Sequence, residues 1–143
     1  EAMQQLNRGA AELAQQVDFH AITDITGFAL LGHACEMAQE SGTRFRFFFD
    51  QLPFLPGAKD YADQWLFPGG ACNNQRTFQE QVSFQGLEEE MQMLLFTPET
   101  SGGLLMALTP DQADRLWALC RQAGQPIWRV GEVVEGSGID VVP

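Results

Sequence analysis

The amino-acid sequence predicts one layered domain of the α+β or α/β class, in which helices pack on a mixed β-sheet. Three observations support this prediction. The chain has 143 residues, of which 45% are hydrophobic, enough for one core with little left over for disordered tails. Stretches with the apolar spacing of helices alternate with short strand-like stretches. Glycine and proline residues mark the breaks between them.

The first four elements are expected to be a helix, a strand, a helix and a strand. Apolar residues at steps of three and four predict a helix over residues 2–16, and its apolar stripe should pack on the sheet that contains the strand 19–23. A second amphipathic helix follows over 28–41, and Gly42 ends it. Alternating Arg and Phe residues over 44–49 predict a strand whose Phe side chains are buried.

Residues 50–86 have the least regular pattern. Prolines and glycines divide this segment, and only residues 57–66 have the spacing of a short helix. Long irregular connections inside compact domains are commonly functional. Two interpretations of residues 68–74 therefore stay open: a loop near a site, or a plain surface loop.

Regular patterns return in the last third of the chain. Helical spacing over 87–96 ends before Pro98, and a strand is predicted over 104–108. Thr109 and Gln112 fit a capping box at the start of the last helix.

Two strands close the predicted fold. Gly124 ends the last helix, and strands over 127–134 and 139–142 then predict a closing hairpin. The whole order is helix, strand, helix, strand, irregular segment, helix, strand, helix, strand, strand. This order is the basis for the predicted layered fold.

The charge of the chain makes nucleic acids and membrane surfaces poor partners. Eight Lys and Arg residues against nineteen Asp and Glu give a net charge of -11, which repels phosphates and anionic lipid. The Arg–Phe alternation over 44–49 therefore favours a strand over a platform for single-stranded nucleic acid. A nucleotide would have to arrive as its Mg²⁺ complex or meet basic groups of another domain. No apolar run reaches the roughly 18 residues of a membrane span, and no signal peptide stands at the front.

The three cysteines favour a reducing environment. Cys35, Cys72 and Cys120 are far apart and form no C-x-x-C pair, which argues against a disulfide framework or a structural zinc site and favours the cytoplasm. Cys120 lies on the apolar stripe of the last helix, so we interpret it as a small core side chain and not as a nucleophile.

One carboxylate stands where a short apolar run meets the start of a helix. The run ends at Asp24, Thr26 and Gly27 let the backbone turn, and a helical pattern begins at once. Free N–H groups at a helix start favour anions, and a carboxylate nearby can anchor the Mg²⁺ of a nucleotide. The alternative is that Asp24 or Thr26 only caps the helix.

A second candidate is the loop over 97–103. Its small hydroxyl residues and the paired glycines Gly102 and Gly103 resemble a phosphate-binding loop, although the lysine and the following helix of a P-loop are absent. Alternatively, the glycines only let the next strand start tightly against a neighbour. A composite site requires Asp24 to face the same pocket as the backbone amides of this loop.

Each of the two histidines has more than one interpretation. His33 lies beside the apolar stripe of the helix over 28–41. A partly buried histidine that is hydrogen-bonded to backbone is favoured there over a metal ligand or a base. The same interpretation applies to His20.

Four segments together resemble the C-terminal domain of selenophosphate synthetase, also called selenide, water dikinase. They are T-D-I-T-G-F followed by L-G-H over 23–33, P-G-G followed by an asparagine over 68–74, T-P-E-T-S-G-G-L-L over 97–105, and V-G-E-V over 130–133. The resemblance covers nearly the whole chain. Two departures are an alanine at position 29, where the family is expected to have glycine, and an asparagine at position 73, where arginine often precedes the asparagine.

The resemblance implies an ATP-using enzyme that joins selenide to phosphate and releases AMP and orthophosphate, with Mg²⁺ carrying the nucleotide. It implies a metal-binding role for Asp24. The residues assigned to nucleotide binding are Gly27, Thr100, Ser101, Gly102 and Gly103. The wider superfamily, which includes aminoimidazole ribonucleotide synthetase, implies the same layered fold for this half.

The resemblance also implies what the chain lacks. Residues 1–143 correspond to the C-terminal domain alone, and the reactive cysteine or selenocysteine of the family belongs to an N-terminal domain, so no cysteine here inherits that role. A start at Glu1, without methionine and inside a helical pattern, fits a piece of a longer chain, but also processing or trimming. We therefore expect the chain alone to be inactive. The N-terminal domain, ATP and selenide are its expected partners, and the full-length protein is expected to be a homodimer.

Two other functions stay open. A related synthetase or kinase of the superfamily would keep the fold, but the segment 23–33 favours selenophosphate synthetase. A non-catalytic nucleotide-binding or interaction domain would need Asp24 only as a cap and the glycines only as turns. Selenide specificity follows from the resemblance alone.

Overall fold

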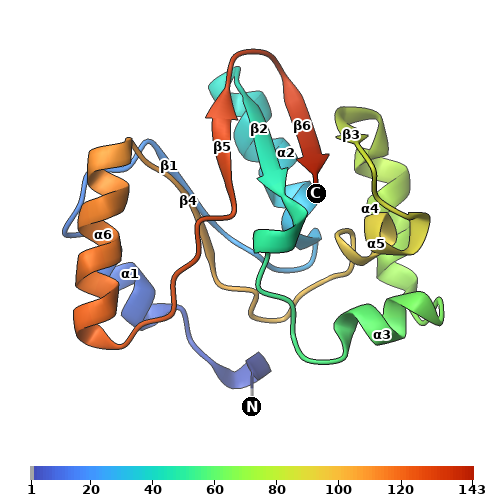
Figure 1. Ribbon diagram of the computed structural model, residues 1–143, viewed down its shortest axis with the longest axis horizontal. Coiled ribbons are helices and arrows are strands. Elements are labelled where there is room, and N and C mark those ends of the chain that lie inside the picture. The colour runs from blue at the N-terminus through green and yellow to red at the C-terminus, as the bar shows by residue number, and fades with distance from the viewer. Residues whose placement is uncertain (1) are drawn as a thin grey trace.

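Helices and strands are interspersed along residues 2–143, which the computed structural model describes (Figure 1). In chain order the elements are η1 (Ala2–Gln4), α1 (Arg8–Ala14), β1 (Ala21–Asp24), α2 (Ala29–Ser41), β2 (Arg44–Phe48), η2 (Phe49–Gln51), α3 (Ala58–Asp63), α4 (Gly69–Phe78), η3 (Gln79–Gln81), β3 (Val82–Phe84), α5 (Glu89–Leu94), β4 (Leu104–Ala107), α6 (Pro110–Ala123), β5 (Gly131–Val134) and β6 (Gly138–Val142). The η elements are short 3₁₀ helices.

The strands form two sheets. The larger sheet has the order β3-β6-β2-β5, with β2 parallel to β6 and antiparallel to β5. Strand β3 is also parallel to β6, whereas β1 and β4 form a separate antiparallel pair. Because the larger sheet is mixed and helices pack on it, the predicted fold class is confirmed.

The predicted closing hairpin is wrong, because β5 and β6 flank β2 instead of pairing with each other (Figure 1). The link between them crosses the end of β2, where Arg44 Nε donates a hydrogen bond to Ser137 O at 3.0 Å. Gly136 in this link and Gly138 at the start of β6 have φ values of 125° and 81°. Glycine adopts such a backbone without steric cost, so a short link can span the neighbouring strand.

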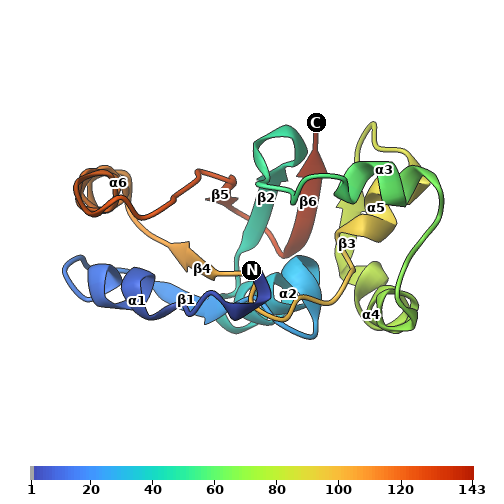
Figure 2. The ribbon, with the colours of Figure 1, turned by 90° about the horizontal axis from the view of Figure 1, so that it is seen from below.

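The main core lies between α2 and one face of the larger sheet. Apolar residues alternate with charged ones along β2 and β6, so the apolar side chains share one face. Helix α2 lies behind this sheet in Figure 1 and below it in Figure 2. The buried residues of this core are Leu31, Ala34, Cys35, Ala38, Phe45, Phe47, Phe49, Phe78, Leu95, Phe96, Ile139 and Val141.

Charged side chains occupy the opposite face of β2 and β6. Arg44 and Arg46 each approach Asp140 Oδ2 at 3.5 Å, and Arg46 also pairs with Glu132 at 3.2 Å. Both guanidinium groups are therefore engaged within the sheet. The Arg–Phe alternation has a structural role, as predicted.

A smaller core joins α1 and α6 beside the β1–β4 pair, at the left of Figure 1. Its buried residues are Val17, Leu116 and Cys120. Cys120 is thus a core side chain, as predicted, and burial raises the pKa of its thiol. The capping box predicted for α6 is wrong, because the side chain of Gln112 accepts the backbone N–H of Asp18 at 3.1 Å and is engaged by this distant donor.

The predicted first helix is wrong at its start. Only Arg8–Ala14 is α-helical, and Met3 and Leu6 are 70% and 80% exposed. Asn7 precedes the helix, but its side chain donates a hydrogen bond to Gly103 O at 3.4 Å instead of capping it. A tertiary contact therefore replaces the continued helix. The apolar stripe of α1 packs mainly on α6 rather than on the sheet.

Residues 50–86 are more regular than predicted. They contain α3, which confirms the short helix within 57–66, and also α4, η3 and β3. The interpretation of residues 68–74 as a loop is wrong, because α4 spans Gly69–Phe78. The buried residues of α4 are Ala71, Asn74 and Phe78. A polar residue in this stripe and two glycines at its start concealed the helical pattern.

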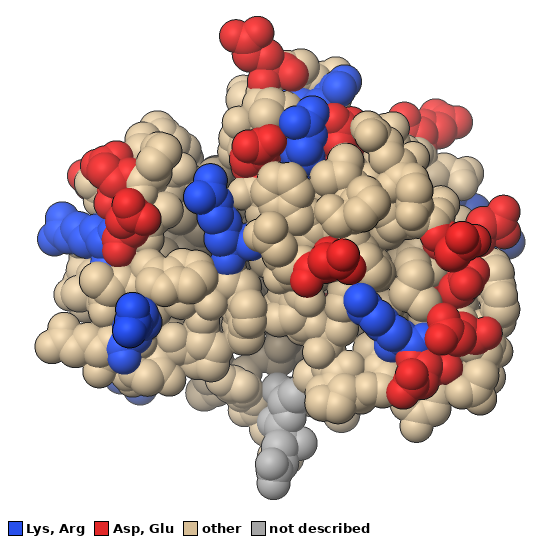
Figure 3. Space-filling model, in the orientation of Figure 1, with Lys and Arg blue, Asp and Glu red and all other residues tan. Residues whose placement is uncertain are grey.

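Acidic side chains are prominent on the surface. Figure 3 shows Asp and Glu side chains near the link between β5 and β6 and along the edge formed by α3 and α5, with Lys and Arg scattered among them. No helix within residues 2–143 has the length and apolar character that crossing a membrane requires.

Ala29 has a backbone conformation that alanine rarely adopts. Its φ is 63°, in the left-handed region, and its side chain is fully buried at the first turn of α2. The preceding turn closes with a hydrogen bond from Ala29 N to Thr26 O at 3.0 Å. A left-handed backbone costs alanine about 1–2 kcal/mol and costs glycine little. This is a physical reason to expect glycine at position 29.

We expect Ala29→Gly to leave the free energy of unfolding unchanged or to raise it. Relief of about 1–2 kcal/mol of backbone strain offsets the loss of a buried methyl group, about 0.8 kcal/mol. Ala34→Gly is the matched control, because Ala34 is also fully buried in α2, and it should lower the free energy of unfolding by about 2 kcal/mol. Urea denaturation measures both values. Equal losses in the two variants would contradict the strain assigned to Ala29.

Candidate functional site

The segment after Asp24 and the double-glycine loop lie side by side. Strands β1 and β4 are antiparallel, with Asp24 opposite Leu104. Beyond the strands, Ile25 N donates to Gly103 O at 3.0 Å, and Gly102 N donates to Ile25 O at 2.9 Å. Backbone hydrogen bonds therefore continue the pairing past the ends of both strands.

Thr26 extends this contact to the other end of the loop. Its carbonyl oxygen accepts the backbone N–H of Glu99 at 2.9 Å and that of Ala29 at 3.0 Å. The turn 26–29 and the loop 97–103 are thus attached to each other along their length. The structure brings together the two segments that we expected to form one site.

Asp24 is exposed at this corner. The alternative interpretation of Asp24 or Thr26 as a helix cap is wrong. Helix α2 begins at Ala29, and its N-cap residue, Phe28, makes no side-chain cap hydrogen bond. The hydroxyl of Thr26 lies 3.1 Å from the Nε2 atom of His33 instead. Neither side chain is therefore needed to start the helix.

The structure explains why glycine is needed at both positions of the pair. A Cβ atom on Gly102 would lie 2.8 Å from Ile25 Cγ2 and 2.9 Å from Ile25 O, and Gly103 has a φ of 88°. The glycines thus let β4 start tightly against its neighbour, which confirms one of the two interpretations. Because the Gly102 N–H donates to Ile25 O, it is not free to bind a phosphate.

Thr100 and Ser101 form the outer part of the loop. Thr100 is exposed, and Ser101 Oγ donates a hydrogen bond to Gln5 O. Asn7 also contacts the loop through its hydrogen bond to Gly103 O. Residues 5–7 therefore cross the loop on one side, whereas Thr100 and the nearby Gly27 stay exposed.

The corner offers few metal ligands. Within residues 2–143, no three His, Cys, Asp or Glu side chains lie close enough together to hold a metal ion. Mg²⁺ commonly binds one or two carboxylates and completes its ligand shell with water and phosphate oxygens. The exposed carboxylate of Asp24 fits such a partial site and does not fit a metal centre made by this chain alone.

Glu99 is a second carboxylate in the loop 97–103. Desolvation by the surrounding protein raises the pKa of its carboxyl, although the residue keeps exposed surface. Its backbone N–H is engaged by Thr26 O, so the residue is attached to the turn after Asp24.

A family model supplies the relationship of this fold to known proteins. The model described as "AIR synthase related protein, C-terminal domain" matches residues 1–142. The chain belongs to this family. As an AIR synthase related C-terminal domain, it carries the Asp24 corner on the β1–β4 pair.

Curated relatives of this AIR synthase related domain are selenide, water dikinases. The chain is 39% identical to the selenide, water dikinase of Caldanaerobacter subterraneus. The match covers 99% of this chain and 41% of the relative. The enzyme of Pelobacter propionicus is 43% identical over 93% of this chain, and that of Colwellia psychrerythraea is 40% identical over 96%. In both cases the match covers 39% of the relative. The chain spans about two fifths of the length of the curated relatives it matches.

Solved structures share the fold of this AIR synthase related domain. AaThiL complexed with AMPPCP and TMP aligns with a TM-score of 0.62 at 20% identity, over 96% of this chain and 34% of that one. The thiamine-monophosphate kinase from Stenotrophomonas maltophilia K279a aligns with a TM-score of 0.58 at 19% identity, over 86% of this chain and 31% of that one. At this identity the similarity shows the fold.

The two histidines of the domain differ. His33 is partly buried, as predicted, but its ring contacts side chains instead of backbone: Nε2 lies 3.1 Å from Thr26 Oγ1, and Nδ1 lies 3.4 Å from Glu36 Oε2. Glu36 is one turn further along α2, so it favours a proton on Nδ1 and leaves Nε2 to accept the Thr26 hydroxyl. His20 is exposed, so the buried histidine predicted there is wrong.

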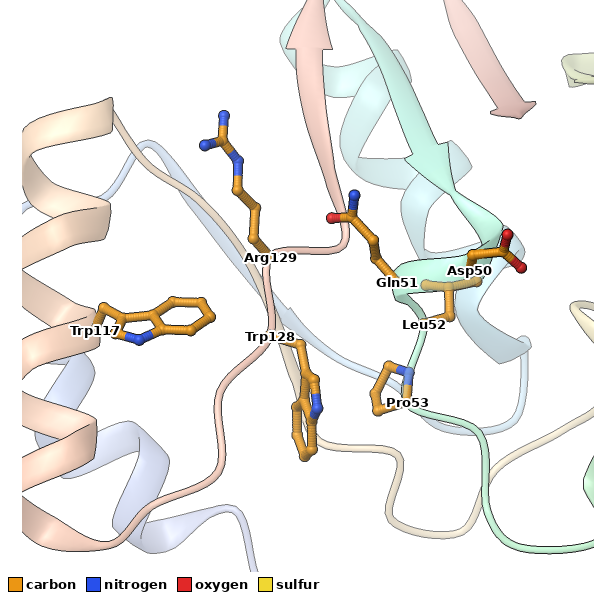
Figure 4. A pocket seen from close by; sticks show the side chains of 7 residues that line it. All are labelled: Asp50, Gln51, Leu52, Pro53, Trp117, Trp128 and Arg129. Atoms are coloured by element: carbon orange, nitrogen blue, oxygen red, sulfur yellow. The ribbon is translucent and has the colours of Figure 1, made fainter. Parts of the chain in front are cut away.

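The structure has a hollow that the sequence did not predict (Figure 4). It has a volume of about 450 Å³, and α6 contributes one of its walls. Its lining residues are Asp50, Gln51, Leu52, Pro53, Trp117, Trp128 and Arg129. Periodicity could not reveal this hollow, because three separate segments form it. Asp24 and the paired glycines are not among its lining residues.

We expect Gly102→Ala to lower the free energy of unfolding of the domain by about 1–3 kcal/mol, because the added Cβ would overlap both the side chain and the carbonyl oxygen of Ile25. Gly27→Ala is the matched control at the same corner, since a Cβ there would meet nothing within 4 Å. It should change stability by less than about 0.5 kcal/mol. Chemical denaturation measures both. A neutral Gly102→Ala would show that β4 does not need this close approach.

Glu99→Gln should raise the melting temperature at pH 7. Desolvation raises the pKa of Glu99 above 4.5, so the folded protein binds this proton more tightly than the unfolded chain. The carboxylate therefore lowers stability as the pH rises through and above 4.5. The gain should disappear at about pH 3, where the carboxyl group is protonated in both states.

Glu135→Gln controls for this experiment, because it removes the same charge from an exposed turn of an acidic protein. Thermal unfolding between about pH 3 and pH 7 is measured for both variants. A gain for Glu99→Gln that does not exceed the gain for Glu135→Gln would contradict the assigned desolvation.

Proposed function

We propose that this domain is the C-terminal half of a selenide, water dikinase, whose complete form makes selenophosphate, AMP and phosphate from selenide, ATP and water. The relatives at 39%, 40% and 43% identity are all selenide, water dikinases, which supports the assignment. The thiamine-monophosphate kinase at 19% identity supports the fold, but not a thiamine phosphate substrate. Residues 1–143 would then be a single C-terminal domain.

The proposed site is the corner formed by Asp24 and the residues Thr100, Ser101, Gly102 and Gly103. The observation that carries the proposal is the backbone pairing of Ile25 with the two glycines, because it holds the exposed carboxylate beside the loop. Asp24 would give one oxygen ligand to Mg²⁺, and the outer loop with Gly27 would contact phosphate oxygens. Mg²⁺, when bound, supplies positive charge that stabilises phosphoryl transfer. The complex of AaThiL with AMPPCP supports a nucleotide on this fold.

One carboxylate and one loop do not form a complete active site. The net charge of -11 opposes the approach of ATP, so basic groups and further metal ligands would have to come from outside this chain. We propose that an N-terminal domain supplies them, together with the reactive cysteine or selenocysteine. The full-length protein would be a cytoplasmic homodimer.

In the full-length protein, Asp24→Asn should lower kcat/KM for AMP release by about 100-fold, because an amide oxygen is a weaker ligand for Mg²⁺ than a carboxylate. AMP release from ATP in the presence of selenide is measured together with selenophosphate by phosphorus NMR. Asp114→Asn removes the same charge from an exposed position on α6 and should change the rate by less than about twofold. An unchanged rate for Asp24→Asn would exclude Asp24 from the site.

The domain alone should release no AMP from ATP, Mg²⁺ and selenide, because the proposed reactive cysteine or selenocysteine and the basic groups belong to the N-terminal domain. The same assay, with the full-length protein as positive control, measures this. An enzyme-like rate from the isolated chain would contradict the proposed division of the site between two domains.

A further inference from the structure

Helix α4 joins both segments of the Asp24 corner through one buried amide. Asn74 is 7% exposed, and its Nδ2 atom donates to Gly27 O at 2.9 Å and to Phe96 O at 3.0 Å. Gly27 lies in the turn after Asp24, and Phe96 immediately precedes the loop 97–103. Two segments that are far apart in the sequence are therefore attached to the same side chain.

The partners of the Asn74 amide fix its orientation. Both neighbours are carbonyl oxygens, so the NH₂ group must face them, and each of its two hydrogens has an acceptor. A serine hydroxyl donates only one hydrogen bond, and an ionised aspartate donates none. The position therefore requires a side chain with two donors on one short group, which is what asparagine provides.

Two packing contacts lie on either side of this amide. A Cβ atom on Gly70 would lie 2.7 Å from Pro98 Cγ, so the first turn of α4 packs directly against the loop 97–103. At the other end of α4, the ring of Phe78 packs edge to face on Phe28, with ring centroids 5.6 Å apart. Helix α4 thus contacts the loop near its start and the turn after Asp24 near its end.

We propose that Asn74 is a positioning residue of the nucleotide site, an inference that rests on the function proposed above. The pairing of Ile25 with Gly103 fixes the turn and the loop at one side. Asn74 fixes them at the other side, through Gly27 and Phe96, and does not touch the substrate itself. Together these contacts set the distance between the Asp24 carboxylate and the outer loop. Precise spacing of this kind is needed to hold a metal ion and phosphate oxygens at once.

The test uses the full-length protein with Mg-ATP and selenide. Asn74→Ala removes both hydrogen bonds, and Gly70→Ala pushes Pro98 away while it leaves the amide in place. Each variant should raise the KM for Mg-ATP by about tenfold and change the KM for selenide by less than about twofold. The controls are Ala71→Gly, at a fully buried position of the same helix, and Gly69→Ala, where a Cβ would meet nothing within 4 Å. Neither control should raise the KM for Mg-ATP by more than about twofold.

Hydrogen exchange gives a second readout that does not depend on catalysis. In folded Asn74→Ala, the backbone amides of Ile25, Glu99 and Gly102 should exchange about tenfold faster than in the wild type, because the turn and the loop open locally. In Ala71→Gly the exchange rates of these amides should rise only as much as the lower global stability of the variant requires.

The outcomes separate this inference from the proposed function. With an active wild type, an unchanged KM for Mg-ATP in Asn74→Ala overturns the positioning role and leaves the proposed function intact. An equal rise in Ala71→Gly overturns it as well, since the effect is then one of stability. If Asn74→Ala does not fold, Asn74→Ser, which keeps one donor, takes its place, and an unchanged KM for Mg-ATP again overturns the positioning role. If the wild-type full-length protein makes no AMP, the proposed function fails, and hydrogen exchange decides whether Asn74 holds the two segments together.

Discussion

The antiparallel pairing of β1 with β4 is the constraint on which the candidate site depends. It places Asp24 opposite Leu104 and continues through Ile25 to the double glycine. Because Gly102 has no side chain, Ile25 can lie against its backbone. The pairing therefore accounts for the glycines without any ligand. The proposed anion-binding role would be a second use of this loop, because the neighbouring strand already requires its shape.

Elements whose buried face follows one period could be predicted from the sequence. Helices α2 and α6 have regular apolar stripes, and both end at a glycine in the left-handed conformation, Gly42 and Gly124. Strand β2 has alternating buried phenylalanines, Phe45 and Phe47. That Asp24 and the glycine loop share a site was expected from the resemblance of both segments to one family, and the pairing of β1 with β4 places them side by side.

The remaining differences arise where a distant contact decides the local structure. Asn7 bonds to Gly103 O, so the first helix starts later than its apolar pattern predicts. Strand β2 inserts between β5 and β6, a choice of partner that no short segment encodes. Asn74 is buried in α4 because its two acceptors come from other elements. The spacing of apolar residues cannot predict the burial of a polar side chain, because that burial depends on hydrogen bonds to distant residues.

The corner is held together by neutral interactions, and this leaves its charge available. Backbone hydrogen bonds, the Asn74 amide and close glycine contacts attach the turn to the loop. None of the ion pairs within residues 2–143 includes Asp24: they are Arg8–Glu12, His33–Glu36 and those across the outer face of the sheet. A carboxylate already paired with a guanidinium would be a poorer ligand for a cation, because the cation would have to displace that partner. Asp24 is in none of these pairs, as the proposed role of its carboxylate requires.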